Sequence, residues 1–246
     1  MKRRWTILSW LVFLGLWEIF ARSEIVNSKL FPGPWNVAHA LINWATDGTL
    51  ISDIGASLTR IFVGLSSGTV LGILVGLGTG RILSLDRSLG SIVNSVRAIP
   101  PVALVPLAIL WFGISENSKF FLVSWGAFFP VWLNTHLGVR NVARSIEWSA
   151  RSLGAKGWRF AVGVILPAAL PHILAGIRLG IGISYVCVFV AEMTGASKGV
   201  GFRIATSHLV FRTDLMLAGM VVLGGLGALT DGVFGVIIRR LFAWQK

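Results

Sequence analysis

Few residues in this sequence have the types and spacing that enzyme chemistry requires. Of its 246 residues 10 are Asp or Glu and 4 are His, and neither a paired Asp motif nor a His/Cys cluster occurs. The single cysteine, Cys187, lies deep in an apolar run, which excludes a disulfide framework and predicts a packing role. No G-x-x-x-x-G-K-[ST] phosphate loop is present. We therefore predict no catalytic residue, no metal site and no cofactor on this chain.

The residues that could act on a solute are polar or helix-bending groups inside apolar runs, where burial in lipid is costly. Arg97 precedes Pro100 and Pro101, whose rings would bend a helix and free carbonyls, and its guanidinium matches an oxyanion. Asn134 and Glu192 lie near the ends of two other runs. These five residues are candidates for lining a translocation path. The alternatives are that Arg97 marks the inner end of its span, that Asn134 makes an interhelical hydrogen bond, and that Glu192 is interfacial or ion-paired.

The elements that hold these residues follow from hydropathy. The chain is 54% hydrophobic and 13% charged, whereas a soluble domain carries about 25% charged residues. Crossing the hydrocarbon core of a bilayer takes roughly 20 apolar residues. The predicted spans are 5–21, 61–80, 91–112, 119–138, 172–193 and 215–238. We therefore predict an all-α integral membrane protein with six transmembrane helices, forming a single domain over residues 1–246.

Lys and Arg predict the orientation of these spans. With the N-terminus inside, the inside segments hold 13 Lys and Arg and the outside segments hold 7. Because basic residues accumulate in cytoplasmic loops, both termini are predicted to be cytoplasmic, in a multi-pass protein of the cell inner membrane. The same bias accounts for the net charge of +12 without a nucleic-acid partner.

Two sequence patterns predict helix packing. Pro34 suits the first turn of an interfacial helix from Trp35 to about Ala45. In the second span, a stripe of small residues at spacing four predicts close helix contact. It consists of Gly64, Gly68, Gly72 and Gly76.

The fifth span is predicted from its prolines. Pro167 and Pro171 would each break a helix interior, so the span is expected to begin after them, at 172. Arg178 then lies about two turns inside the span, close enough to snorkel to the interface.

The largest basic inside loop, residues 139–171, is far longer than two helices need as a connection. Glu147 and Arg151 are spaced for an i,i+4 ion pair, and Gly154 interrupts the helix. One helical stripe consists of Ala150, Leu153, Gly154 and Trp158. The pattern predicts a short amphipathic helix, a glycine break and a second short helix. Such a knob either enters a groove on a partner protein or lies on the membrane interface without one.

This loop resembles the cytoplasmic signature of ABC-importer permeases. The stretch Ala150-Arg-Ser-Leu-Gly-Ala precedes Val164-Ile-Leu-Pro, and the spacing from Gly154 to the Leu-Pro pair is the specific part. Trp148 stands where the family usually has Glu, and Ser149 replaces the first alanine. The resemblance implies an ATPase-coupling set, which consists of Glu147, Trp148, Ala150, Arg151, Leu153, Gly154, Ala155, Lys156, Leu166 and Pro167.

The resemblance extends over nearly the whole chain and narrows to permeases for sulfonates, taurine, nitrate and related compounds. The supporting segments are 97–107, 110–114, 129–135, 190–193 and 213–214. It implies a type I ABC-importer permease fold with a cytoplasmic coupling helix. It also implies that two copies of the chain form the pore and that a cytoplasmic ATPase dimer, carrying ATP and Mg²⁺, docks on the coupling loops. A periplasmic or lipid-anchored binding protein would deliver the solute.

The expected function is therefore that of the transmembrane subunit of an ABC importer, not an enzyme. The segments Leu110-Trp-Phe-Gly-Ile and Asn134-Thr look more like the sulfonate and taurine branch, so an aliphatic sulfonate or taurine is the preferred solute. Nitrate, bicarbonate or a thiamine precursor is the alternative within the same class. An ATP-independent secondary transporter is the alternative of a different class, but it would normally show inverted repeats.

Overall fold

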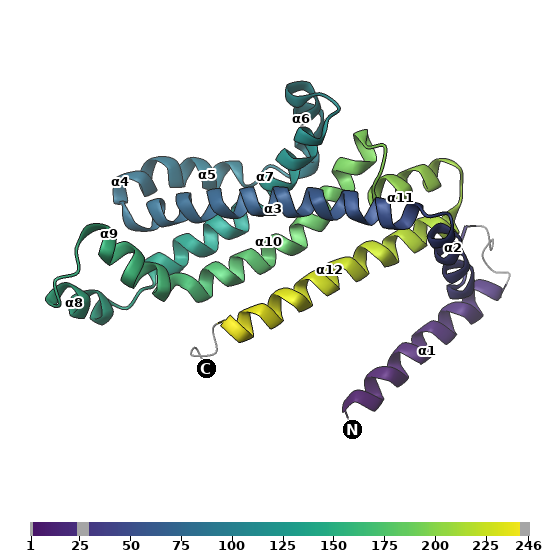
Figure 1. The fold of residues 1–246 in the computed structure, drawn as a ribbon, viewed down its shortest axis with the longest axis horizontal. Coiled ribbons are helices and arrows are strands. Elements are labelled where there is room, and N and C mark those ends of the chain that lie inside the picture. The colour runs from purple at the N-terminus through teal and green to yellow at the C-terminus, as the bar shows by residue number, and fades with distance from the viewer. Residues whose placement is uncertain (1, 24–29, 242–246) are drawn as a thin grey trace. The chain divides into compact units, whose positions relative to one another are not determined.

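The computed structural model describes residues 2–23 and 30–241, and within them the chain is helical with no strand (Figure 1). The α-helices are α1 (Lys2–Arg22), α2 (Pro34–Thr46), α3 (Thr49–Arg81), α4 (Leu83–Leu85), α5 (Ser91–Val96), α6 (Val105–Phe112), α7 (Glu116–Arg140), α8 (Arg144–Ser152), α9 (Gly157–Phe160), α10 (Leu166–Gly195), α11 (Val200–Leu209) and α12 (Thr213–Leu241). Asp86–Gly90 and Ala161–Ile165 are π-helical, and Pro101–Leu104 is a 3₁₀ turn. The predicted all-α class is confirmed.

Three stretches of the described chain are long and apolar enough to cross a membrane. They are Thr49–Arg81, Gly157–Gly195 and Thr213–Arg240. A bent pair, Leu83–Val96 with Pro101–Phe112, would be a fourth span. α1 and α7 contain 21 and 25 residues, enough to reach across roughly 30 Å at 1.5 Å per residue. The count of six spans is compatible with these lengths and stays a prediction.

Contacts divide the chain into two compact units. One comprises Met1–Ser57 with Glu192–Leu226, and the other comprises Leu58–Ala191 with Gly227–Lys246. The first has a small core of Val37, Ala40 and Ala218. The single-domain interpretation of the sequence stays a prediction.

The second unit is built on close contact between α3 and α7. A Cβ at Gly72 would lie 2.9 Å from the backbone oxygen of Phe128, and one at Gly76 would lie 2.6 Å from the Cβ of Thr135. Only glycine allows backbones to approach this closely. The predicted packing role of the glycine stripe is confirmed.

α3 begins 12 residues before the predicted start of the second span at residue 61. The added turns carry Asp53, Ser57 and Arg60, which are polar but buried, with exposures of 2%, 0% and 4%. Arg60 donates to Glu116 through Nε and Nη2, at 2.6 and 2.7 Å. The helix therefore extends beyond the predicted span, because each of these polar side chains is buried against a partner distant in sequence. The boundary of the membrane span stays a prediction.

The third predicted span, 91–112, is not one helix. α5 ends at Val96, Pro100 is extended with ψ 137°, and the two helical arms differ in direction by 88°. The residue before a proline avoids the α conformation, and neither Pro100 nor Pro101 can donate a backbone hydrogen bond. The tandem prolines therefore break the helix instead of bending it slightly.

The helix that holds the fifth predicted span begins before residue 172, so Pro167 and Pro171 do not break it as predicted. Helix runs without interruption over Gly157–Gly195, with Pro171 inside α10. The π-helical turn Ala161–Ile165 ends two residues before Pro167 and shifts the hydrogen-bond register close to the position where proline has no backbone N–H to donate. Leu166 and Pro167 are therefore the first residues of α10 and not part of a loop.

Candidate functional site

Within the predicted coupling loop 139–171, residues 144–167, here called the coupling segment, form a helical elbow between α7 and α10 (Figure 1). Where α8 ends, the amide of Gly154 donates to the carbonyl of Arg151, and the amide of Ala155 donates to the carbonyl of Ala150, both at 3.0 Å. These two bonds form a Schellman motif, which places Gly154 at the left-handed position with φ +82°. The predicted arrangement of helix, glycine break and helix is confirmed.

The two sides of the elbow differ in chemistry. Ala150 and Ala155 pack against a buried cluster, whereas Trp148, Leu153 and Trp158 are 66%, 89% and 79% exposed. The cluster consists of Val139, Val142, Phe160, Ile165, Ala169 and Ile173. The predicted single stripe is therefore wrong, because the glycine turn sends Leu153 away from the core that Ala150 contacts.

Charged groups tie the elbow to the C-terminal end of α3. Glu147 accepts hydrogen bonds from Arg81 Nη1 and Nη2, at 2.8 and 3.3 Å. The guanidinium groups of Arg81 and Arg151 lie 5.1 and 5.4 Å from the ring centroid of Phe160. Glu147 thus pairs across to α3, where the sequence predicted a pair with Arg151 within α8. The result is a mechanical link between α8 and α3.

The remaining coupling candidates lie along the same elbow. Lys156 is exposed and extended, at φ −139°, immediately before α9. Leu166 packs against the buried cluster, and Pro167 is exposed at the start of α10. Since α9, the π-helical turn and α10 are continuous, any displacement of the elbow passes directly into α10.

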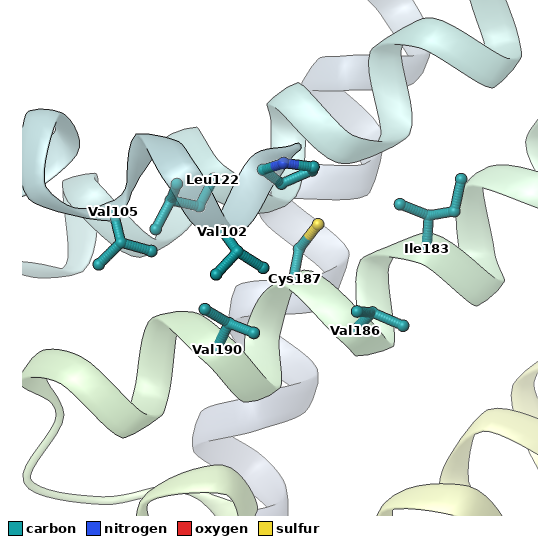
Figure 2. Close-up of a pocket in the computed structure, with 8 residues that line it drawn as sticks. Val102, Val105, Leu122, Ile183, Val186, Cys187 and Val190 are labelled. Atoms are coloured by element: carbon teal, nitrogen blue, oxygen red, sulfur yellow. The ribbon is translucent and has the colours of Figure 1, made fainter. Parts of the chain in front are cut away.

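Three of the path candidates lie at the break between α5 and α6. Arg97 follows the last residue of α5 and is exposed, as is Pro100. Pro101 lines an apolar pocket of about 130 Å³ between this break, α7 and α10, with the Cys187 side chain directed into it (Figure 2). The pocket is lined by Pro101, Val102, Val105, Leu122, Ile183, Val186, Cys187 and Val190. Its walls suit hydrocarbon and not an anion.

The other two path candidates are held inside the protein. The Asn134 Nδ2 amide donates to the Pro130 carbonyl at 2.8 Å, and a Cβ at Gly176 would lie 2.8 Å from the Asn134 Cβ. Asn134 therefore lies at the contact of α7 with α10. Glu192 is fully buried and accepts hydrogen bonds from Ser57 Oγ and Gly201 N, both at 2.8 Å. Of the path candidates, Arg97, Pro100 and Pro101 lie together at the break between α5 and α6, and Asn134 lies at a helix contact of the same unit.

Sequence reasoning missed a buried polar cluster at the N-terminus of α11. The successive amides of residues 199–201 donate to Asp53 Oδ1, Ser57 Oγ and Glu192 Oε2, at 2.9, 3.0 and 2.8 Å. Arg203 then donates to Asp53 Oδ2 at 2.9 Å. The cluster satisfies amides that a helix start otherwise leaves without partners. The available signal was the spacing of four between Asp53 and Ser57, which places both on one face of a helix.

A second feature joins α10 to α12 inside two predicted spans, and the sequence did not identify Arg178 as the partner of Asp231 in it. Arg178 donates from Nε to Asp231 Oδ1 and from Nη2 to Asp231 Oδ2, both at 2.6 Å. Farther along α10, the hydroxyls of Tyr185 and Thr230 are hydrogen-bonded at 2.6 Å. Arg178 is therefore half of a bidentate ion pair, where the sequence predicted a snorkelling side chain.

Comparison with known proteins identifies the family. The profile of the binding-protein-dependent transport system inner membrane component matches residues 68–243, which is most of the chain. The chain belongs to this family. The taurine transport system permease protein TauC of Escherichia coli (strain K12) is 34% identical over 239 residues, covering 95% of this chain and 87% of TauC. A provisionally named aliphatic sulfonates transport permease protein, SsuC of Bacillus subtilis (strain 168), is 35% identical over 96% of this chain and 85% of its own length.

The solved structures agree on the fold. The MetNI methionine ABC transporter, in inward-facing conformations, has a chain that superposes with a TM-score of 0.68 at 22% identity, covering 78% of this chain and 95% of that one. This likeness confirms the type I importer permease fold. As a permease subunit of an ABC importer in the inner membrane, the chain is not an enzyme, and ATPase activity belongs to a separate subunit.

Proposed function

We propose that two copies of this chain form the pore of an importer for a small organic anion, with an aliphatic sulfonate or taurine as the preferred solute. The observation that carries the proposal is the helical elbow of the coupling segment, with its fixed shape and its exposed tryptophan and leucine side chains. The preference among solutes rests on the SsuC and TauC relatives, at 32–35% identity.

In this proposal the coupling segment is cytoplasmic, as are both termini, and it enters a groove on the ATPase. Trp148, Leu153 and Trp158 supply apolar anchors of the kind that dominate protein interfaces. The Schellman turn at Gly154 and the pair of Glu147 with Arg81 fix the elbow before docking, so little ordering entropy remains to be lost. The departure at Trp148 then replaces a carboxylate contact with an aromatic one.

Movement of the docked ATPase would be transmitted along two routes. One is the continuous helix from Gly157 to Gly195, and the other is the Arg81 end of α3. Both helices include predicted membrane spans, so closure of an ATPase dimer would tilt or shear them and change access to the path. A binding protein on the opposite side of the membrane would supply the solute.

Co-purification with the ATPase tests the docking. Leu153→Asp places a charge on a side chain that is 89% exposed and leaves the fold intact, so it should lower ATPase recovery at least about tenfold. Leu209→Asp is the matched control, because Leu209 is 75% exposed but lies outside the coupling segment. Equal recovery of the ATPase with the two variants would remove the docking proposal.

The solute is tested on the partner binding protein and on reconstituted vesicles. Taurine, alkanesulfonates, nitrate, bicarbonate and thiamine precursors are compared by thermal shift and then by ATP-dependent uptake. Nitrate is the second candidate, because the nitrate import permease protein NrtB of Leptolyngbya laminosa is 27% identical over 96% of this chain. A response to nitrate alone would overturn the sulfonate preference.

A further inference from the structure

The ion pair between Arg178 and Asp231 lies where charge is costly. Both residues belong to helices that are long and apolar enough to cross a membrane. Arg178 is six residues past 172 and Asp231 seven residues before 238, the predicted inner ends of their spans, so both lie roughly 10 Å along the helix from those ends. An aspartate side chain is too short to snorkel over that distance. The predicted spans therefore place the pair inside the membrane region and not at its surface.

The pair is also open on one side. The side chains of Arg178 and Asp231 are 60% and 39% exposed in the isolated chain. Charged groups at membrane depth face a water-filled cavity or other protein and not lipid tails. Opposite Tyr185, α12 presents Gly227, where a Cβ would be 3.7 Å from the tyrosine ring, and Thr230. A polar strip of Arg178, Asp231, Tyr185 and Thr230 thus runs between the two helices.

The guanidinium has a second binding edge available. A guanidinium carries five N–H donors arranged so that two different edges can each hold an oxyanion bidentately. Asp231 occupies the edge formed by Nε and Nη2. The edge formed by Nη1 and the second hydrogen of Nη2 has no hydrogen-bond partner among the described residues. Each carboxylate oxygen of Asp231 likewise accepts one of these bonds and has a further lone pair.

We propose that the Arg178–Asp231 pair is a binding site on the translocation path for a small zwitterion that carries an oxyanion and an ammonium group. The oxyanion binds the open guanidinium edge, and the ammonium binds the carboxylate of Asp231. The proposal rests on the importer function proposed above and narrows its solute to aminosulfonate-like molecules, of which taurine is the probe.

Charge balance favours a zwitterion over a simple anion. The ion pair is neutral as a whole, so an alkanesulfonate would leave one negative charge uncompensated in a low-dielectric region. A zwitterion adds no net charge and pairs each of its groups with the opposite charge. Nitrate would use the guanidinium edge but would meet the same repulsion from Asp231.

The test is ligand binding to the purified, full-length permease in lipid nanodiscs, read by thermal unfolding at constant ionic strength. Taurine should raise the unfolding midpoint at concentrations about 10- to 100-fold lower than ethanesulfonate or ethylamine, because each of these lacks one charge-assisted contact. Equal responses to taurine and ethanesulfonate in the unmodified protein would overturn the proposal.

Asp231→Asn supplies the sharper readout. It should weaken taurine binding about 10- to 100-fold and strengthen ethanesulfonate binding, so that the order of preference inverts. A purely structural ion pair predicts no inversion. Arg178→Lys keeps the positive charge but loses the paired N–H donors of the guanidinium. It should therefore weaken the binding of both taurine and ethanesulfonate without inverting their order. If Asp231→Asn does not fold, the comparison in unmodified protein and the Arg178→Lys result still decide the matter.

A zwitterionic lipid headgroup has the same chemistry, so the discs are made with and without phosphatidylethanolamine. Loss of the taurine response only when that lipid is present assigns the site to the headgroup and overturns the solute proposal. ATP-driven uptake by the reconstituted importer is measured separately. Uptake of a sulfonate without the preference for taurine over ethanesulfonate in nanodiscs refutes this site alone. Binding without uptake of any of these solutes refutes the proposed import of sulfonates.

Discussion

Replacing Gly154 with alanine should loosen the elbow by an amount set by its backbone alone. Gly154 has φ +82°, and a Cβ built there would meet nothing within 4 Å, so steric overlap contributes nothing. An L-residue in the left-handed region costs roughly 1–2 kcal/mol. That cost falls on the Schellman bonds of the Gly154 and Ala155 amides. Their hydrogen exchange should therefore accelerate about 5- to 30-fold.

Hydrogen exchange followed by mass spectrometry over residues 144–156 measures this change. Gly163→Ala is the matched control, because a Cβ at Gly163 also meets nothing within 4 Å but the residue is helical. There alanine should leave exchange unchanged or slow it, since glycine in a helix costs about 0.5–1 kcal/mol relative to alanine. Gly154→Asn should fall between alanine and glycine, because asparagine tolerates the left-handed region. Equal exchange in Gly154→Ala and Gly163→Ala would refute the assignment of the turn.

Three further predictions concern packing and polar contacts. Gly68→Ala should destabilise the fold by about 1–3 kcal/mol and lower the thermal unfolding midpoint, because the added methyl group would overlap the α7 backbone. Gly78→Ala is the control and should leave the midpoint unchanged, because the nearest atom to its added Cβ lies 3.5 Å away. Ser57→Ala removes the buried acceptor of the first α11 amide and should cost about 1–3 kcal/mol, measured against Ser67→Ala, whose hydroxyl bonds only its own helix. Glu147→Gln should cost about 0.2–1 kcal/mol and reduce the fall in the unfolding midpoint that added salt causes, because its ion pair is partly exposed and is one of several that salt screens.

Local patterns in the sequence predicted the local structure. Pro34 opens α2, which spans Pro34–Thr46 against a predicted 35–45, and Gly154 ends α8. In both cases the decisive physics lies within a few residues: a proline suits the first helical turn, and a glycine suits the left-handed cap. The helix stripe of Gly64, Gly68, Gly72 and Gly76 was equally readable, because its spacing fixes one face.

The missed features depend on partners that are distant in sequence. Hydropathy alone places Asp53 outside any membrane span and predicts that it is exposed. It is buried because Gly199 and Arg203, about 150 residues away, donate hydrogen bonds to its carboxylate. Arg178 was expected to reach the interface alone, and Asp231 on another helix changes that conclusion. Composition shows that a charge inside an apolar run needs a partner, but only the fold shows which partner it has.

One continuous helix connects the proposed ATPase-docking surface with the proposed solute site. Trp158, exposed on the coupling segment, and Arg178, in the ion pair, belong to one uninterrupted helix from Gly157 to Gly195. Twenty residues separate them, about 30 Å at 1.5 Å per residue. Asp231 lies on α12, which has no part in the elbow. A force applied to the elbow therefore moves one partner of the ion pair and not the other. A bidentate pair tolerates little such displacement. The Arg178 guanidinium and the Asp231 carboxylate would therefore separate or realign when the elbow moves. If both proposals hold, the helix that the docked ATPase displaces is also the helix that opens or closes the charged site.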